Sequence, residues 1–381
     1  MACVPEPASG VTIGATLPGV KAWPRHRQGG MLAAEATALA STPTSKNPGP
    51  SARVAPAPAL GVVVIGKNEG QQLLRALGSI GPRAAAVVYA DSASTDDSVA
   101  LVREHFPAVR VVQLDATRPL SPARGRNEGM AELRRALPDV ALVQFLDGDC
   151  DLCPGWLEGA STYLEEHAEV GIVCGRLRER HRERNRFHRL ADMEWAQPAG
   201  DIDDLGGIMM VRTRTWDDVD GQNADIPAAE EREFCRRALA RGWRARRLPE
   251  DMALHDIDME ELSEWWTRMT RMGHSWAQGL WIYRDRYHLR HVASLAVWGA
   301  LIPALAVVGA LPTLGVSFTL LFPYRRLWRR MVVEREAQGD RPDDARLYAT
   351  AMLAAKLAGS VGVARFFLRT LPAGRGGRRG G

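Results

Sequence analysis

Cysteine is scarce in this sequence of 381 residues. The five cysteines, at positions 3, 150, 153, 174 and 235, are odd in number and scattered along the chain. That usage excludes the dense disulfide framework of a small secreted domain and indicates a reducing compartment. Cys150 and Cys153 form a C-x-x-C, but no second cysteine or histidine pair stands at zinc-finger spacing. We therefore interpret them as small buried residues flanking a loop, rather than as a metal or redox site.

An apolar targeting segment is also missing from the N-terminus. The first 30 residues mix Pro, Gly and charge without the apolar core of a signal peptide. Residues 1–59 are rich in Ala, Pro, Ser, Thr and Gly and predict a disordered leader, within which Met31 is an alternative start. The net charge is only +4, yet arginines cluster at 176–189, 284–290 and 325–330. Such clusters indicate anionic partners such as phosphates or lipid headgroups.

Short apolar runs alternate with helical stretches from residue 60 onward. This alternation predicts an α/β fold with a mostly parallel, Rossmann-like central sheet and flanking helices. Ligands of such sheets bind at the carboxyl ends of the strands, where polar turns follow each apolar run. The basic stretch 176–189 interrupts the alternation and is interpreted as a solvated helical face or an acceptor-side loop. The strands are expected near 61–65, 85–90, 109–114, 140–146 and 206–211.

An acidic motif ends the fourth expected strand. Asp147 and Asp149 stand one residue apart, with Asp151 as a third candidate. Two carboxylates at a strand terminus can hold a hard divalent cation against a diphosphate. A solvated acidic turn is the alternative when the motif is taken alone.

Five other motifs stand in a fixed order around this one, and together they resemble the inverting family 2 glycosyltransferases of the GT-A fold. The resemblance covers about residues 60–280. The six pieces, in chain order, are Gly66-Lys67-Asn68-Glu69, Asp91-Ser92-Ala93-Ser94-Thr95-Asp96, Ala123-Arg124-Gly125-Arg126-Asn127-Glu128-Gly129, Phe145-Leu146-Asp147-Gly148-Asp149, Gly206-Gly207 and Glu230-Glu231-Arg232-Glu233-Phe234-Cys235.

The resemblance implies a nucleotide-diphosphate sugar as donor and Mg²⁺ or Mn²⁺ as cofactor. The metal ligands would be Asp149 and, beyond the last motif, His255; a purely structural His255 is the alternative. An exposed residue in the first turn of a helix is the alternative for Arg126. The residues expected around the nucleotide sugar are Asn68, Glu69, Asp91, Arg126, Asn127 and Asp147.

The resemblance also places the catalytic base. An inverting transfer needs a carboxylate that takes the proton of the acceptor hydroxyl. The family usually has Glu-Asp at the start of a helix here, whereas this chain has Glu230 and Glu231. Glu231 occupies the position of the base, and the longer side chain leaves Glu230 as the alternative. Without the other motifs, both would be read as residues that favour a helix N-terminus.

A segment further on resembles the part that closes over donor or acceptor in these enzymes. Arg268 and Arg271 are three residues apart and so share one helix face. They are expected to meet phosphates of the donor or of a lipid-linked acceptor, or else to anchor the protein at a membrane surface beside the tryptophans. The Gln-x-x-Arg-Trp motif of processive synthases is absent, which favours transfer of a single sugar.

A long uncharged stretch predicts association with a membrane. Residues 292–323 contain no formal charge over 32 positions, with basic residues on both sides. Pro and Gly near its middle favour a kinked hairpin with both ends in the cytoplasm over a single crossing. We therefore expect a GT-A domain over 60–285 on the cytoplasmic face of the cell inner membrane. Residues 286–381 would form a membrane-associated helical region with a basic tail, and a buried helical hairpin is the alternative.

Three other functions compete with this interpretation. A nucleotidyltransferase shares the scaffold but usually has a Gly-rich loop after its first strand, where this chain has 66–69. A catalytically inactive, membrane-attached binding protein is compatible with the Glu-Glu departure, although both acidic motifs are retained. A nucleic-acid binder is disfavoured because 176–189 interleaves acidic residues and offers one aromatic residue for stacking. The acceptor stays open between a lipid, a lipid-linked saccharide and a small molecule.

Overall fold

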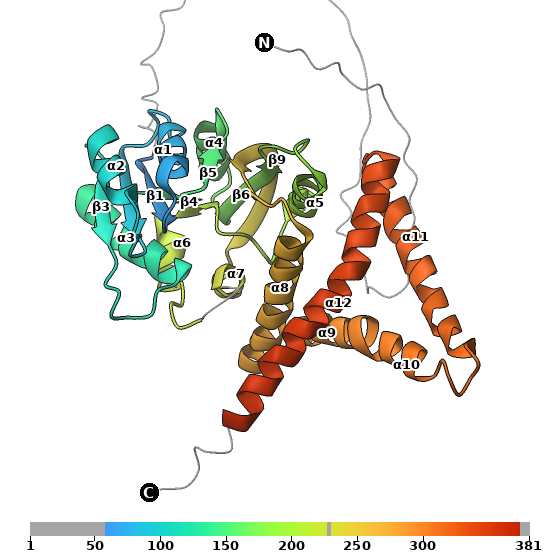
Figure 1. Cartoon of the computed structure of the whole chain (residues 1–381). Coiled ribbons are helices and arrows are strands. Elements are labelled where there is room, and N and C mark those ends of the chain that lie inside the picture. Colours follow the sequence, from blue (N-terminus) through green and yellow to red (C-terminus); the bar gives the residue numbers. More distant parts are fainter. Residues whose placement is uncertain (1–57, 227–229, 374–381) are drawn as a thin grey trace, which may run out of the picture. The chain divides into compact units, whose positions relative to one another are not determined.

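The computed structural model describes residues 58–226 and 230–373. The leader predicted for 1–59 lies outside these residues except for its last two, and so does the end of the predicted basic tail. Figure 1 shows a sheet domain followed by a series of C-terminal helices.

The sheet domain has one mixed sheet in the order β3-β2-β1-β4-β8-β6-β9-β5, with β7 pairing with β9. The first four strands in this order are parallel, β8 runs antiparallel to β4 and β6, and β6 and β9 are again parallel. The predicted α/β sheet with flanking helices is confirmed. The strands are β1 (Leu60–Gly66), β2 (Ala86–Asp91), β3 (Arg110–Gln113), β4 (Leu142–Asp147), β5 (Cys150–Leu152), β6 (Val170–Glu179), β7 (Gly200–Asp201), β8 (Met209–Arg212) and β9 (Arg244–His255).

Alternating side chains of the central strands supply two separate cores. In β1, Val62 and Val64 point to one face and Val63 and Ile65 to the other, as the period of two in a strand requires. Helices α1 (Gly70–Gly78), α2 (Ser98–His105) and α4 (Trp156–Glu166) cover the first face. The second is covered by α3 (Pro122–Ala136), α6 (Thr213–Asp218) and α7 (Glu230–Ala240). Because both faces are buried, the central parallel strands β1, β2 and β4 are continuous apolar runs.

The interpretation of 176–189 as a solvated face or loop holds only for residues 180–185, which form turns, and is wrong for both ends of the stretch. Its first part completes β6, and its last part begins α5 (Arg186–Trp195). The arginines fit the strand because they lie at its end, where Arg178 bonds to Asp192 and Asp251. Ion pairing thus replaces the apolar pattern by which a strand is usually recognised.

The C-terminal helices follow β9 and include a hairpin. Residues 286–308 form one continuous helical stretch, and turns at 309–315 reverse the chain before η2. The uncharged stretch 292–323 therefore contains both arms and the turn. The helices are α8 (Leu262–Tyr283), α9 (Arg286–Ala296), η1 (Val297–Leu301), α10 (Ile302–Val308), η2 (Val316–Leu321), α11 (Phe322–Ala337) and α12 (Pro342–Ala373).

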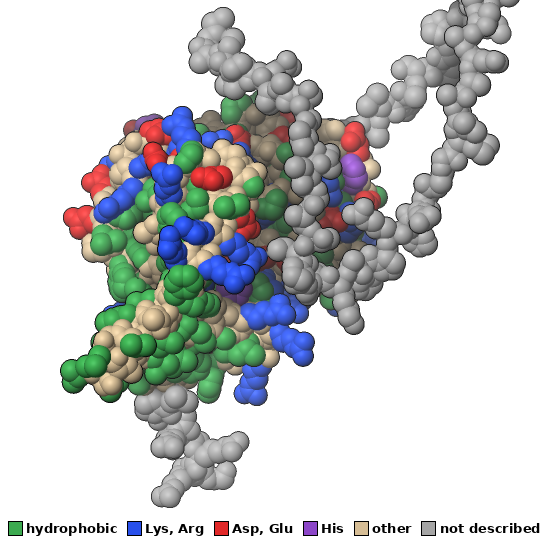
Figure 2. All heavy atoms as spheres, turned by 90° about the vertical axis from the view of Figure 1, so that its right-hand side faces the viewer, with side chains coloured by type: hydrophobic (Ala, Val, Ile, Leu, Met, Phe, Trp, Pro, Cys, Tyr) green, Lys and Arg blue, Asp and Glu red, His purple; other side chains and the backbone are tan. Residues whose placement is uncertain are grey.

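The large apolar side chains of this hairpin are exposed. Val308 is 75% exposed, Leu311 87% and Leu314 95%. Figure 2 shows hydrophobic side chains gathered in the lower part of one face, with Lys and Arg side chains beside them. Two helical stretches, Arg286–Val308 and Pro342–Thr370, are long and apolar enough to cross a membrane, and 22% and 33% of their most apolar windows are buried.

Helix α12 packs closely against α8 through glycines. A Cβ atom on Gly273 would lie 2.0 Å from the carbonyl oxygen of Gly359, and one on Gly362 would lie 2.0 Å from that of Thr270. Both helices therefore approach backbone to backbone, as small residues allow. The N-terminal end of α12 is joined to the sheet domain by Asp344, which is buried and accepts hydrogen bonds from Arg182 and Arg189.

Candidate active site

A cavity of about 510 Å³ opens at the carboxyl ends of β1 and β4. This is the edge of the sheet at which polar turns were predicted to converge. The N-terminal end of α3 and the first turn of α7 form its other walls. The lining residues are Ile65, Gly66, Lys67, Glu69, Ser92, Leu120, Ser121, Pro122, Arg126, Asp147, Gly148, Asp149 and Glu231.

Arg126 joins the two acidic motifs of the cavity. Its side chain is only 2% exposed, so it is not the exposed helix residue of the alternative interpretation. Nη2 donates to Asp147 Oδ1 at 3.3 Å, and Nη1 donates to Glu231 Oε1 at 3.1 Å and to Gln222 Oε1 at 3.2 Å. Burial would lower the pKa of Arg126, but the charges of Asp147 and Glu231 outweigh it and raise the pKa. A permanently charged arginine therefore holds β4 and α7 together.

Gly207 provides the space for this arginine. A Cβ atom at this position would lie 2.1 Å from Arg126 Nη2 and 3.0 Å from Asp147 Oδ2. At the neighbouring Gly206, a Cβ atom would meet nothing within 4 Å. Of the two glycines in the motif, only Gly207 is thus required for the packing of the described residues.

The two glutamates at the start of α7 have different environments. Glu231 lines the cavity and its side chain is 18% exposed, whereas the side chain of Glu230 is 6% exposed and does not line it. Glu230 lies 3.7 Å from Arg126 Nη1. Burial first, and then the charge of Glu231, raises the pKa of Glu230 from 4.5 to about 7. Glu231 is therefore the carboxylate that a bound molecule can reach.

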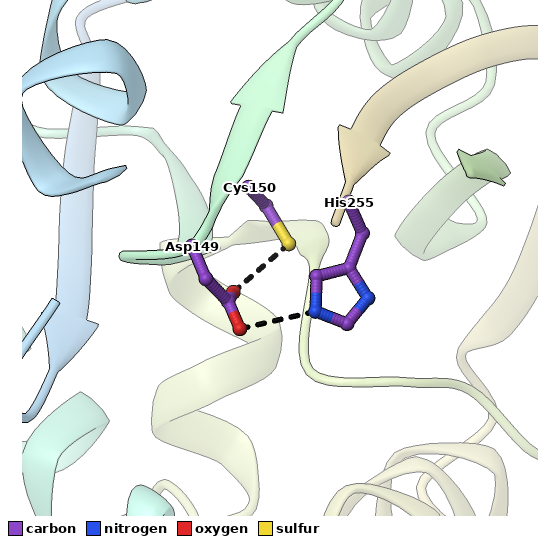
Figure 3. A group of neighbouring side chains, drawn as sticks. All are labelled: Asp149, Cys150 and His255. Carbon is purple, nitrogen blue, oxygen red and sulfur yellow. Dashed lines mark hydrogen bonds and ion pairs between the residues drawn. The ribbon is translucent and has the colours of Figure 1, made fainter. Parts of the chain in front are cut away.

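Asp149 lies beside His255, which comes from the end of β9 (Figure 3). Asp149 Oδ2 is 3.0 Å from His255 Nε2, and Cys150 Sγ donates to Asp149 Oδ1 at 3.2 Å. Burial alone would lower the pKa of His255, but the hydrogen bond and charge of Asp149 outweigh it and raise the pKa. Burial would raise the pKa of Asp149, but the hydrogen bond and charge of His255 outweigh it and lower the pKa. The Trp195 ring packs on the imidazole with centroids 4.8 Å apart.

The expected nucleotide-binding residues near β1 and β2 form one loop network. Asn68 adopts a left-handed backbone with φ of 60°. Its Oδ1 accepts from Thr95 N at 2.7 Å, while its own N–H donates to Ser94 Oγ. Asp91 is fully buried and accepts from Tyr89 and from the N–H of Ser94. These two residues shape the rim of the cavity rather than line it.

Three further predicted site residues lie away from the cavity. The side-chain amide of Asn127 bonds to the backbone N–H and carbonyl of Gln222 and so fixes that loop. Arg268 pairs with Glu194 of α5 at 2.6 Å. Arg271 is exposed on α8. None of the three lines the cavity.

Several cavity residues were not singled out from the sequence. Ser92 and Lys67 lay inside motifs already recognised, and their place directly after a strand was the available signal. Two neighbours of the site lie outside the cavity lining: Trp195 carried no signal in the sequence, and Cys150 was interpreted from its C-x-x-C as a small buried residue. Trp195 reaches His255 only because α5 crosses the end of β9, and the Cys150 thiol turns toward Asp149 at the start of β5.

Comparison with known proteins places this geometry in a class. Residues 61–216 match the model of glycosyl transferase family 2. No curated protein sequence matches the chain. The mannosyltransferase PcManGT from Pyrobaculum calidifontis, solved in complex with GDP-Man and Mn²⁺, is 19% identical with a TM-score of 0.50; the alignment covers 81% of this chain and 88% of that one. For residues 1–349 of TarS from S. aureus, solved with UDP, the identity is 16%, the TM-score 0.44 and the coverage 82% and 91%.

The mixed sheet and its flanking helices have the GT-A fold, with the acidic cavity at the ends of β1 and β4. Within this fold, residues 61–216 are similar to glycosyl transferase family 2. The resemblance to family 2 and to the GT-A fold that the ordered motifs indicate is confirmed over this range.

Proposed function

We propose that this glycosyltransferase moves one sugar from a nucleotide-diphosphate sugar to an acceptor hydroxyl, with inversion at the anomeric carbon and assistance from a divalent metal. The observation that carries the proposal is that Glu231 and Asp149 open into the same cavity while separate partners hold them. A base and a metal ligand can therefore act on opposite sides of one bound donor.

The residues at Asp149 fit Mg²⁺ or Mn²⁺. A carboxylate oxygen and an imidazole nitrogen 3.0 Å apart offer donor types that these cations accept. Bound there, the cation would neutralise the charge that develops on the departing nucleotide diphosphate. Trp195 packs on the ring of His255 and limits its rotation, so the imidazole stays directed toward Asp149.

Glu231 is the proposed base. Its Oε1 accepts from Arg126, and Oε2 makes no hydrogen bond within residues 58–226 and 230–373. Oε2 can therefore take the proton of the acceptor hydroxyl while Arg126 fixes the direction of the carboxylate. Asp147, on the other side of the arginine, is the proposed partner of the ribose. In this proposal the enclosed Glu230 contributes through packing.

The donor is proposed to lie between the β1 and β2 loops and the start of α3. Lys67 and Ser92 can donate to phosphate or sugar oxygens from the cavity wall. The N-terminal end of α3 carries a partial positive charge toward the same space, because Ser121 and Pro122 at the start of this helix line the cavity. Asn68 and Asp91 would hold the loops that border the base and ribose.

The hairpin of η1, α10 and η2 is proposed to enter the membrane, with both ends on the cytoplasmic side of the cell inner membrane. Its exposed apolar residues have no charged neighbour in the stretch 292–323, and Arg325, Arg326, Arg329 and Arg330 follow directly. A charge-free tip beside basic side chains fits the acyl region and the anionic headgroups of one leaflet. Non-processive transfer to a lipid, a lipid-linked saccharide or a small molecule stays part of this proposal.

The test is a panel of nucleotide-diphosphate sugars incubated with purified full-length chain. Release of nucleotide diphosphate is measured with Mn²⁺, with Mg²⁺ and with chelator, and the configuration of the transferred sugar by NMR. We expect release from one donor class that requires the metal and falls about 100-fold or more in Asp149→Ala. Equal turnover with chelator or in Asp149→Ala would refute the metal role. A retained anomeric configuration would refute inversion.

A further inference from the structure

The proposed metal ligands have a thiol for a neighbour. Cys150 is 2% exposed, and its Sγ lies 3.2 Å from Asp149 Oδ1. One ligating atom each from Asp149, Cys150 and His255 lies within 4.8 Å of the others. Figure 3 shows the sulfur and the imidazole directed toward the same carboxylate, although they come from β5 and β9. The pairing of β5 with β9 holds Cys150 and His255 close together, because these two residues are opposite partners in the β5–β9 ladder.

This donor set differs from one that serves Mg²⁺ or Mn²⁺ alone. Hard cations take oxygen ligands and leave a thiol unbound, whereas thiolate and imidazole together favour Zn²⁺ and its heavier relative Cd²⁺. Ligand atoms at the corners of a zinc tetrahedron are about 3.5 Å apart, given bonds of about 2.0–2.3 Å. Cys150 Sγ lies 3.2 Å from Asp149 Oδ1 and His255 Nε2 lies 3.0 Å from Asp149 Oδ2, so each separation is close to that spacing. Because they end on different oxygens, the carboxylate must turn to present one oxygen to an ion shared with the thiol and the imidazole.

We propose that Cys150 is a third metal ligand, which only thiophilic cations engage, so that Zn²⁺ or Cd²⁺ occupies the site of Asp149 and His255 and inhibits the enzyme. On binding, the Cys150 S–H bond breaks, its proton goes to solvent and a sulfur–metal bond forms. Three protein ligands leave a four-coordinate ion one open position, too few to hold a diphosphate as a six-coordinate ion can. The binding claim stands on the residues themselves, while the inhibition claim rests on the proposed function.

A purely structural thiol is the competing explanation. Cys150 donates a hydrogen bond to Asp149, and a buried thiol can do that without ever meeting a metal. Serine preserves the hydrogen bond and removes the sulfur. Cys153 is a matched control, because it is also a free cysteine, lies three residues away and is outside the group.

The binding test titrates Cd²⁺ into purified full-length chain and follows the thiolate-to-cadmium charge-transfer band in the ultraviolet. We expect one component of this band to depend on Cys150, so that Cys153→Ser keeps the component and Cys150→Ser loses it. In His255→Gln, which retains the thiol, the Kd for the Cd²⁺ that gives this component should rise at least about tenfold. Circular dichroism checks each variant for folding. The proposal is overturned if Cys150→Ser keeps the whole band, or if His255→Gln binds Cd²⁺ as wild type does.

The inhibition test adds Zn²⁺ to Mn²⁺-supported turnover of the donor found in the panel. Each variant is compared with its own rate without Zn²⁺, and half-inhibition should need at least about tenfold more Zn²⁺ in Cys150→Ser than in wild type or Cys153→Ser. A chain that turns over no donor but shows the Cys150-dependent band refutes the proposed function and keeps the metal site. Normal turnover with equal Zn²⁺ sensitivity in all three proteins refutes inhibition through Cys150.

Discussion

The sheet domain buries its apolar side chains, whereas the hairpin exposes them. In the sheet domain, apolar residues fill two cores and the charged residues Arg126, Asp147 and Glu231 converge on a cavity. In the hairpin, Val308, Leu311 and Leu314 are exposed. An exposed apolar tip of this kind marks a surface that meets something other than water. On our proposal, the sheet domain therefore carries out the transfer, and the hairpin places the protein at the membrane.

The largest effect is expected in the sheet domain. Glu231→Gln removes the proposed base while keeping a group that Arg126 can hold, so kcat/KM should fall about 10²–10⁴-fold with membrane binding unchanged. Glu230→Gln is the matched control because its carboxylate is enclosed, and it should cost less than about tenfold. A steady-state assay with the identified donor measures both. A larger loss in Glu230→Gln would move the base to Glu230.

The converse effect is expected in the hairpin. Val308→Asp places a charge where a leaflet would receive it, which costs about 3 kcal/mol, so partitioning to anionic lipid vesicles should fall about 100-fold. Release of nucleotide diphosphate from the donor should persist. Leu262→Asp is the control, because Leu262 is 56% exposed at the start of α8. Sedimentation with vesicles decides the matter, and equal binding of both variants would remove the membrane role of the hairpin.

A smaller effect separates the two glycines of one motif. Gly207→Ala forces the Arg126 side chain to move, since its Cβ would lie 2.1 Å from Nη2. A displaced Arg126 misdirects Glu231, and we expect kcat to fall about 10–100-fold. Gly206→Ala meets nothing within 4 Å and should leave kcat within about twofold. Similar losses in both variants would show that the motif acts through its backbone instead.

The smallest effect is one of stability. The pKa of Glu230 is raised from 4.5 to about 7, so the folded state holds a proton that the unfolded state releases between these values. Stability should therefore fall as the pH rises from 4.5 to 7 and stay lower above that. Glu230→Gln should flatten this fall and raise the Tm relative to wild type at pH 8, but not at pH 4.5. Thermal unfolding at both pH values measures the difference; parallel curves would contradict it.

The sequence predicted the first half of the sheet better than the second. Strands β1, β2 and β4 are continuous apolar runs, and burial on both faces made them recognisable. Strands β6 and β9 carry arginines at 176, 178, 244, 246 and 247, and neither was expected. Their charges are compensated by carboxylates distant in sequence, such as Asp201 for Arg244 and Arg246. Long-range pairing of this kind is invisible to a local pattern.

The site shows the same limit. Asp149 and His255 were predicted as a pair through the resemblance, and their side chains meet in the structure. Arg126 and Glu231 were assigned to separate tasks, yet they are hydrogen-bonded to each other. Asn127 was expected near the nucleotide, but its amide fixes the loop at Gln222. Residue types and order locate a site, whereas the partner of each side chain depends on how distant elements cross.

The glycine contacts between α8 and α12 fix the axial position of α12. The carbonyl oxygens of Gly359 and Thr270 leave no room for a Cβ atom on Gly273 and Gly362, respectively, and a Cβ atom on Gly359 would meet Leu295 of α9. One residue added to α12 before Gly359 would rotate both of its glycines about 100° away from α8, because a helix turns once in about 3.6 residues. The C-terminal helix can thus dock in a single axial setting. Changes in the length of α12 are therefore constrained from Asp344 to Phe366, because Val363 and Phe366 also pack against Ala277 of α8.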